Sequence, residues 1–413
     1  MSSPRTRDIL RGAQARAWGV RDIALGSVSR LTRRSVAGVQ GIPRWGVNLV
    51  GSSPSAVGLT EATRCMARAL EVQQVPFATI RTRAALRGEQ GVGPRTVPPD
   101  AAPFAMNIVC ANGDGTRGFM RQAGPRFFDD RYSIALWWWE VGRAPARWAE
   151  VSRTFNEVWV CSDHVLEALS GICMAPLLKI RQPVPLPSAP PLSRRELGLP
   201  DGFIFYSTFD YSSTFARKNP LAVAAAFRRA FAEGSGAHLV IRSVNGRRDR
   251  HHRRRLERAV DGRSDIHIID RDLESRWRNA MLAQCDCYVS LHRAEGFGLS
   301  LAEAMRLGKP VIATAWSGNL EFMTPENSYL VRCDTVAVGP GSWPYDPKAV
   351  WAEPDIEHAA AAMREILEDP ARAAATGAQA ARDLRAWHDP SVAGGPIAQR
   401  LDDLRAKQSS CLI

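Results

Sequence analysis

Residues 287–314 constrain the fold of this chain more than any other stretch. A short apolar, partly β-branched run at residues 287–291 is typical of a buried strand. The loop that follows, residues 292–298, contains two glycines, which can adopt positive φ and admit a ligand close to the backbone. Strong helix formers occupy residues 299–307, and a second apolar strand is predicted at residues 311–314. The stretch therefore predicts a strand–loop–helix–strand unit of an α/β fold, in which glycines open the helix.

Two carboxylates lie on either side of these glycines. Glu295 stands at the end of the first strand, and Glu303 follows eight residues later on the first turns of the helix. A helix start offers free backbone N–H groups and the positive end of a dipole, both of which suit a phosphate. Because a carboxylate accepts hydrogen bonds from sugar hydroxyls, a nucleotide-sugar would use all of these groups, with its diphosphate on the loop amides. The residues predicted to bind the diphosphate through their amides are Gly296, Phe297, Gly298 and Leu299.

Each of these features alone is common in α/β proteins, but together they resemble a known motif. Family-four retaining glycosyltransferases carry a Glu-x7-Glu pattern at their donor site. Their Glu-Gly-Phe-Gly loop, Glu-Ala-Met helix, Gly-x-Pro-Val-Ile turn and later Gly-x-x-Glu are matched here at residues 295–298, 303–305, 308–312 and 318–321. We therefore expect this chain to be similar to that family.

The resemblance implies a fold and a reaction. The fold is α/β, with two Rossmann-like α/β/α domains facing across a cleft, the B-type glycosyltransferase architecture. The reaction moves a sugar, with retention at the anomeric carbon, from a nucleotide-diphosphate donor, UDP- or GDP-sugar first among them, to a hydroxyl of a glycan, a lipid-linked acceptor or a small molecule. Glu295 would lie against the transferred sugar, and Glu303 would bind the ribose hydroxyls. We expect no cofactor.

Two cations are candidates for binding the diphosphate. Arg217 and Lys218 precede Asn219 and Pro220, which are expected as N-cap and first residue of a helix at residues 221–231. The resembled family also places an arginine and a lysine near this point, although its usual Gly-Arg is replaced here by Phe-Asp. Since no Asp-x-Asp metal motif stands out, we expect these cations and the loop amides to stabilise the leaving group without a metal.

A further pair of donor-site candidates follows from position alone. A strand is predicted at residues 266–269, and in the resembled family the base-binding backbone comes directly after this strand. Asp272 and Leu273 occupy that place here.

The N-terminal half contributes two acceptor-side candidates. A strand at residues 45–51 and a helix at residues 59–70 resemble the start of a Rossmann-like unit, but no GxGxxG fingerprint joins them. Gly58 lies in the loop between them, where plain turn chemistry is the alternative. The apolar run at residues 132–139 predicts a strand that ends in Glu140, at the edge where open α/β sheets bind ligands. A structural ion pair is the alternative for Glu140, and tryptophans replace the histidine motif that many family members carry.

The length of 413 residues exceeds one ordinary core and predicts two domains. The proline-dense residues 183–191 are the best boundary. We expect the following parts: a basic N-terminal segment at residues 1–40, an acceptor-side domain at 41–185, a nucleotide-sugar-binding domain at 192–385, and a C-terminal helix or tail at 386–413. In the resembled fold, the last helices brace the first domain.

The net charge of +12 favours anionic partners. No nucleic-acid-binding signature appears, and the most basic run, residues 247–258, is expected to form a solvated helix face. In residues 5–34, arginines alternate with apolar residues at helical spacing. Both a helix lying on an anionic membrane and a locally packed tail fit that pattern.

The expected compartment is the cytoplasm, with peripheral contact at the inner face of the membrane left open. The chain starts without an apolar signal core, and no run approaches the roughly 20 apolar residues of a membrane helix. None of the eight cysteines forms a CxxC pair. Cys285 and Cys287 are expected to be buried thiols rather than metal ligands.

Other classes of protein share the expected architecture. A sugar-nucleotide epimerase would convert the donor with no acceptor present. A phosphorylase would need a lysine that binds pyridoxal phosphate, for which Lys309 is a poor candidate. A non-catalytic protein would bind the nucleotide-sugar without turnover.

Overall fold

The computed structural model divides the chain into two compact units, Met1–Pro43 and Arg44–Ile413. The residues that the structure describes are 44–51, 57–80 and 95–410. The basic segment expected at residues 1–40, and its contact with a membrane, lie outside these residues. Among the described helices, none combines the length and the apolar character that crossing a bilayer would need.

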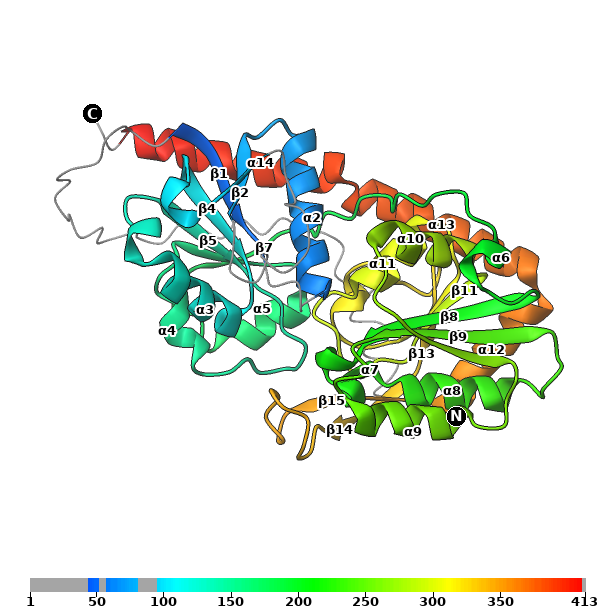
Figure 1. Ribbon diagram of the computed structural model, residues 1–413. Helices are drawn as coiled ribbons and strands as arrows, with labels where there is room; N and C mark the ends of the chain where they lie inside the picture. The colour runs from blue at the N-terminus through cyan, green and yellow to red at the C-terminus, as the bar shows by residue number, and fades with distance from the viewer. Residues whose placement is uncertain (1–43, 52–56, 81–94, 411–413) are drawn as a thin grey trace. The chain divides into compact units, whose positions relative to one another are not determined.

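The first sheet of the larger unit has seven parallel strands in the order β3-β2-β1-β4-β5-β6-β7 (Figure 1). These strands are β1 (Arg44–Val50), β2 (Phe77–Ile80), β3 (Thr96–Val97), β4 (Phe104–Cys110), β5 (Tyr132–Leu136), β6 (Glu157–Val160) and β7 (Leu177–Lys179). The helices that accompany them are α2 (Val57–Val72), α3 (Gly113–Ala123), α4 (Trp148–Ser152) and α5 (Asp163–Ser170). Consecutive parallel strands joined by helices make this sheet a Rossmann-like unit.

The strand predicted at residues 132–139 is shorter in the structure. β5 ends at Leu136, because the amide of Trp138 donates to the Asn112 side chain at 2.8 Å instead of to a neighbouring strand. The alternation of side chains nevertheless continues past the strand end. Trp138 joins one hydrophobic cluster, whereas Trp137 and Trp139 join the cluster on the opposite face. All three tryptophans therefore belong to the core.

The second sheet has six parallel strands in the order β10-β9-β8-β11-β12-β13. These are β8 (Phe203–Asp210), β9 (Ala237–Val244), β10 (Ile266–Asp270), β11 (Cys287–Ser290), β12 (Val311–Thr314) and β13 (Tyr329–Val331). Its helices are α6 (Arg194–Leu197), α7 (Phe215–Lys218), α8 (Pro220–Ala230), α9 (Arg250–Val260), α10 (Ser275–Gln284), α11 (Leu299–Arg306), α12 (Ile356–Glu368) and α13 (Pro370–His388). An antiparallel hairpin of β14 (Cys333–Ala337) and β15 (Val350–Pro354) stands apart from both sheets.

Helices cover both faces of the second sheet. Successive residues of a strand point to opposite faces, so Phe205 packs in a cluster with α8 and α12 while Tyr206 packs with α10 and α11. The second of these clusters also contains Leu49 and Ile108 of the first sheet. One continuous core therefore serves both sheets. Cys285 and Cys287 are buried thiols within these clusters, as predicted.

The last helix, α14 (Pro390–Ser410), packs against the first sheet and its helix α2. The side chain of Gln73, directly after α2, donates to the carbonyl of Ser391 at 2.9 Å. Arg400 forms an ion pair with Glu157 of β6, whose side chain is only 2% exposed. The same carboxylate accepts hydrogen bonds from Tyr132 and Trp159. A buried acid with a single cationic partner thus ties α14 to β6.

Replacing Arg400 by alanine should lower the free energy of unfolding by about 3 kcal/mol, because the Glu157 carboxylate would remain buried without its cation. Denaturant unfolding followed by circular dichroism measures this. The exposed Asp402→Ala on the same helix serves as control and should have little effect. In a Glu157→Gln background the Arg400→Ala loss should shrink markedly, and equal losses in both backgrounds would contradict this role for the ion pair.

Candidate active site

The predicted strand–loop–helix–strand unit is present as β11, the loop at residues 291–298, α11 and β12. Gly298 directly precedes α11 with φ of +94°, and a Cβ there would lie 2.9 Å from Cδ1 of Leu301. Only glycine fits such a conformation without strain. The glycine therefore allows the chain to turn from the loop into the helix at this point.

A second glycine packs closely against the loop. Gly318 lies in the short helix η5 (Ser317–Glu321), and a Cβ on it would lie 2.1 Å from the carbonyl oxygen of Gly296. Its amide donates to the carbonyl of Glu295 at 2.9 Å. The predicted Gly-x-x-Glu segment thus packs against the loop and forms a hydrogen bond with it.

The same loop is bonded to the first domain. The Ser162 hydroxyl, which also caps α5, donates to the carbonyl of Gly296 at 2.6 Å. Glu321 accepts from the amide of Asp163 at 2.5 Å and from Lys179 at 3.0 Å. These bonds fix the loop between α5 and the second sheet.

The Glu295 carboxylate is held by two cations of α7. Lys218 donates to one of its oxygens, and Nη1 of Arg217 lies 3.2 Å from the other. Burial alone would raise the pKa of Glu295, but Lys218 and Arg217 more than offset it and lower that pKa to about 2. Burial in turn lowers the pKa of Lys218 despite the neighbouring acid. The carboxylate is therefore ionised throughout the physiological range.

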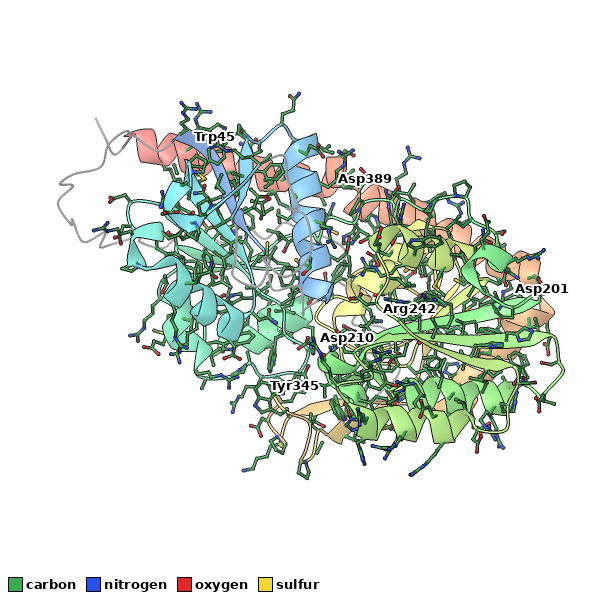
Figure 2. All side chains as sticks on the ribbon, in the orientation of Figure 1. Trp45, Asp201, Asp210, Arg242, Tyr345 and Asp389 are labelled. Carbon is green, nitrogen blue, oxygen red and sulfur yellow. The ribbon has the colours of Figure 1, made fainter. Side chains whose placement is uncertain are left out.

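Glu140 belongs to the same cluster of charges. It lies 3.7 Å from Nη2 of Arg217, so the ion pair considered as its structural alternative is present. Tyr345, from the loop between β14 and β15, donates its hydroxyl to Glu140 at 3.1 Å. Figure 2 labels Tyr345, which lies in the loop that joins β14 and β15. Arg217 thus links an acid from the first domain with Glu295.

A hollow lies beside this cluster at the carboxyl ends of β8 and β9. Residues of the second domain that line it include Tyr206, Thr208, Asp210, Lys218, Arg242, Arg278, Leu299, Ser300 and Glu303. Gly58 and Glu61 of α2 line it from the first domain. Figure 2 labels Asp210 and Arg242 where these strands end. The hollow therefore combines residues from both domains around the start of α11.

Glu303 is half-buried in this hollow, and its side chain has no hydrogen bond or ion pair with another residue of the described segments. Burial, reinforced by the nearby Glu61, raises the pKa of Glu303 to about 8, against the opposing effect of Arg278. An unpartnered acid with a raised pKa in a concave site is a candidate for ligand binding.

The structure separates the sites predicted from the sequence into two groups. Lys218, Glu303, Leu299 and Gly58 line the hollow, whereas Glu295, Arg217 and Glu140 form the adjacent charge cluster. Five further residues that line the hollow were not predicted from the sequence: Arg242, Arg278, Tyr206, Thr208 and Ser300. Arg242 could have been found by the rule that selected Glu140, because it is a charged residue near the carboxyl end of the apolar strand β9.

Three predicted positions do not contribute side chains to the hollow. The ring of Phe297 is 3% exposed and packs on Phe322 in the core, with ring centroids 4.8 Å apart. Asp272 is exposed, and Leu273 packs against the hydrophobic cluster that both sheets share. Asn219 and Pro220 occupy the predicted N-cap and first positions of α8, but the Asn219 side chain makes no capping hydrogen bond. It adopts φ of +51° and donates to the carbonyl of Leu291.

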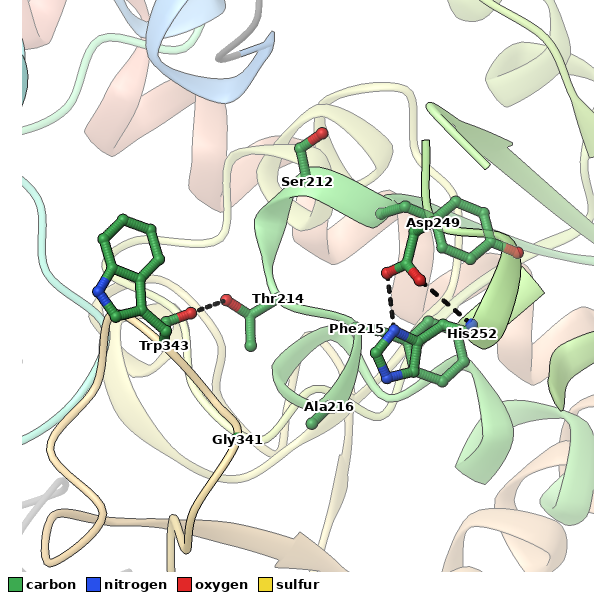
Figure 3. A pocket seen from close by; sticks show the side chains of 9 residues that line it. Ser212, Thr214, Phe215, Ala216, Asp249, His252, Gly341 and Trp343 are labelled. Atoms are coloured by element: carbon green, nitrogen blue, oxygen red, sulfur yellow. Dashed lines mark hydrogen bonds and ion pairs between the residues drawn. The ribbon is translucent and has the colours of Figure 1, made fainter. Parts of the chain in front are cut away.

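A second hollow lies on the other side of α7 (Figure 3). Three of its polar side chains have partners: His252 bonds to Asp249 at 2.7 Å, and the Thr214 hydroxyl donates to the carbonyl of Trp343 at 3.3 Å. The buried hydroxyl of Tyr211, which also lines this hollow, has none among the described residues. Phe215 stacks on His252 with ring centroids 4.7 Å apart. Since the charged groups that line this hollow are paired with each other, the first hollow is the better candidate.

Part of the second domain matches a family model. Residues 215–393 match the model of a family described as Family 4 Glycosyltransferase in conflict systems. This segment contains Arg217, Lys218, Glu295 and Glu303. Among curated proteins, none matches the sequence.

Solved structures with the same fold cover most of the chain. Alr3699/HepE of Anabaena, solved with UDP and glucose, has a TM-score of 0.64 over 87% of this chain and 100% of its own, at 13% identity. Sucrose-phosphate synthase of Thermosynechococcus elongatus has a TM-score of 0.63 over 88% and 100%, at 16% identity. A glycosyltransferase of Rickettsia africae has 0.63 over 87% and 98%, at 11% identity. The likeness concerns the fold, and it confirms the predicted class of two Rossmann-like α/β/α domains.

The raised pKa of Glu303 predicts a pH-dependent stability. The unfolded chain loses the Glu303 proton near pH 4.5, whereas the folded state keeps it up to about pH 8. The tighter binding of this proton stabilises the folded state at low pH, and that stabilisation is lost as the pH rises from about 4.5 to about 8. Glu303→Gln removes the titration, so its melting temperature should exceed that of the wild type by an amount that grows across this window and levels off above it. Differential scanning fluorimetry between pH 5 and 9 measures the difference. The exposed Glu368→Gln should run parallel to the wild type, and a parallel profile for Glu303→Gln would contradict the assignment.

Proposed function

We propose that this chain, a family-four glycosyltransferase by the match over residues 215–393, transfers a sugar from a nucleotide-diphosphate donor to an acceptor hydroxyl. The match confirms the family that the motif from Glu295 to Glu303 resembled. The donor site is the hollow at the start of α11. Retention of the anomeric configuration and the choice of acceptor, whether a glycan, a lipid-linked or a small molecule, are further parts of the proposal.

One observation carries the proposal: a glutamic acid side chain with no partner among the described residues and a lysine line the same hollow at the start of a helix. Glu303 offers acceptors for the two ribose hydroxyls, and Lys218 offers a cation for the diphosphate. A ligand that satisfies both must carry neighbouring hydroxyls and an anion, separated by the distance between the two side chains. A nucleoside diphosphate has both groups.

The start of α11 supplies the remaining phosphate ligands. The first intrahelical bond is made by the amide of Leu301 to the carbonyl of Gly298, at 3.0 Å. The amides of Leu299 and Ser300 precede this bond, so they are available to an anion at the positive end of the helix. Leu299 and Ser300 both line the hollow. Negative charge that develops on phosphate oxygens bound there would be stabilised by these amides and by Lys218.

Glu295 is proposed to act on the transferred sugar. Its carboxylate stays ionised, with a pKa of about 2, and can stabilise positive charge that develops at the anomeric carbon. Lys218 bonds to Glu295 and also lines the hollow, so it can contact the leaving phosphate and the acid at the same time. Glu140 of the first domain is linked to Glu295 through Arg217, which supports an acceptor position on the side of the first domain.

The known binding of a related fold supports the donor class. The structure of Alr3699/HepE holds UDP and glucose. We therefore propose a UDP- or GDP-sugar as donor for this chain.

A thermal-shift panel of UDP-, GDP-, ADP- and dTDP-sugars tests the function. A donor at 100 times its Kd should stabilise the protein by about 2.7 kcal/mol, which raises the melting temperature measurably. Turnover is then measured as release of nucleoside diphosphate with candidate acceptors. Absence of any shift across the panel would exclude the proposal, and conversion of the donor sugar without acceptor would identify an epimerase instead.

Steady-state kinetics should separate the two glutamates. Glu303→Ala removes hydrogen bonds made equally to substrate and transition state, so the donor KM should rise about tenfold with little change in kcat. Glu295→Gln removes charge stabilisation specific to the transition state, so kcat should fall about 100-fold. Glu368→Gln is the matched surface control. The opposite pattern would show that the two roles are exchanged.

A further inference from the structure

We infer that Arg242 reads the base of the donor nucleotide and selects bases with a keto oxygen at C4 of a pyrimidine or C6 of a purine, namely uracil, thymine or guanine. Cytosine and adenine, which carry an amino group at that position, are disfavoured. This inference rests on the proposed function and deepens it by naming the class of donor. It starts from the charge of one side chain in the hollow.

Arg242 is a buried cation without a counter-charge. It is 6% exposed, and no carboxylate of the described residues lies within ion-pairing distance of it. Its Nη2 donates to the carbonyl of Arg271 at 3.2 Å, and its Nη1 makes a long contact of 3.5 Å with the Thr208 hydroxyl. Its Nε is buried and has no partner. The side chain therefore keeps donors available within the hollow.

Arg217, the other arginine that is buried to this degree, is different. Two carboxylates, Glu295 and Glu140, lie within 3.2 and 3.7 Å of it. A buried charge without such compensation destabilises the fold by several kcal/mol. The lack of a partner for Arg242, in a hollow that it lines, is explained if a ligand supplies the acceptors.

The strand order places Arg242 where a base would lie. α11 follows β11, whereas Arg242 lies on β9, with β8 between them. Two strand spacings amount to about 10 Å. The hollow extends in this direction, because its lining includes residues of β8, β9 and α10 but none of β12 or β13. With the diphosphate at the start of α11 and the ribose at Glu303, the base must extend toward β9.

The chemistry of the guanidinium then sets the preference. It has only donors, so it binds the keto oxygen of uracil or thymine, or the O6 and N7 pair of guanine. The amino groups of adenine and cytosine stand at the corresponding position, and a donor there faces another donor. Thr208 lies opposite Arg242 in the register of β8 and β9, and its hydroxyl can hold the guanidinium in place.

Isothermal titration calorimetry with UDP, GDP, ADP and CDP tests the inference, because these ligands carry no sugar. The wild type should bind UDP or GDP at least about tenfold more tightly than ADP and CDP, which matches a discrimination of 1–3 kcal/mol per good contact. In Arg242→Met this preference should fall to near unity while the affinity for ADP stays unchanged. Arg242→Lys, which keeps the charge but loses the planar fork, should retain only part of the preference.

Arg278→Met is the matched control, because Arg278 lines the same hollow but is paired with Glu61 at 3.3 Å. It should shift all four affinities by a similar factor. Thermal unfolding verifies that Arg242→Met folds, and the loss of an unpaired buried charge should raise its melting temperature.

Three results would overturn the inference in distinguishable ways. Equal affinity of the wild type for keto and amino bases, or a preference that survives in Arg242→Met, overturns base reading and leaves the proposed function intact. If Arg242→Met weakens only the binding of nucleotide-sugars with an acidic sugar, the guanidinium binds the sugar instead of the base. Failure of all four nucleotides to bind overturns the proposed function together with the inference.

Discussion

The buried contact of Glu295 with Lys218 and Arg217 is the interaction on which the arrangement of the site depends. It joins α7, at the end of β8, to the glycine loop that follows β11. Because the loop is bonded through Gly296 to Ser162 of the first domain, the contact also sets where Lys218 stands relative to that domain. Removing one member would leave a buried charge uncompensated, so these groups are constrained as a set.

Glu295 and Glu303 belong to one motif, but their different surroundings give these identical side chains different pKa values and different proposed roles. Glu295 touches two cations, and its pKa falls to about 2; Glu303 faces Glu61 and a partly apolar wall, and its pKa rises to about 8. At neutral pH the first is an anion and the second carries a proton. A charged group beside the reacting sugar and a neutral group that can both donate to and accept from ribose hydroxyls fit the roles proposed for them.

The fold could be predicted from the sequence because its signals are local. Glycines before a run of helix formers, flanked by short apolar runs, specify the unit around α11, and alternation placed the tryptophans after Leu136 in the core. Contacts between distant residues could not be derived in this way. The bond from Lys218 to Glu295 spans 77 positions, and the side chain of Asn112 decides where β5 ends. The position of Arg242 near the carboxyl end of an apolar strand could have indicated it, but its lack of an ion-pair partner among the described residues becomes visible only in the structure.

Two of the cations that line the hollow, Lys218 and Arg242, favour different groups of one ligand. Lys218 already has Glu295 as partner, so only a strongly anionic group such as a diphosphate can compete for its remaining hydrogens. Arg242 has no ion-pair partner among the described residues, so neutral oxygen acceptors suffice to satisfy it without a second anion. A molecule that is anionic at one end, hydroxylated in the middle and carries a neutral keto group at the other end meets both cations and Glu303 together. The order of these three groups along the hollow therefore argues for a nucleotide whose base points toward β9. In the reverse orientation the diphosphate would lie at Arg242, away from the amides at the start of α11.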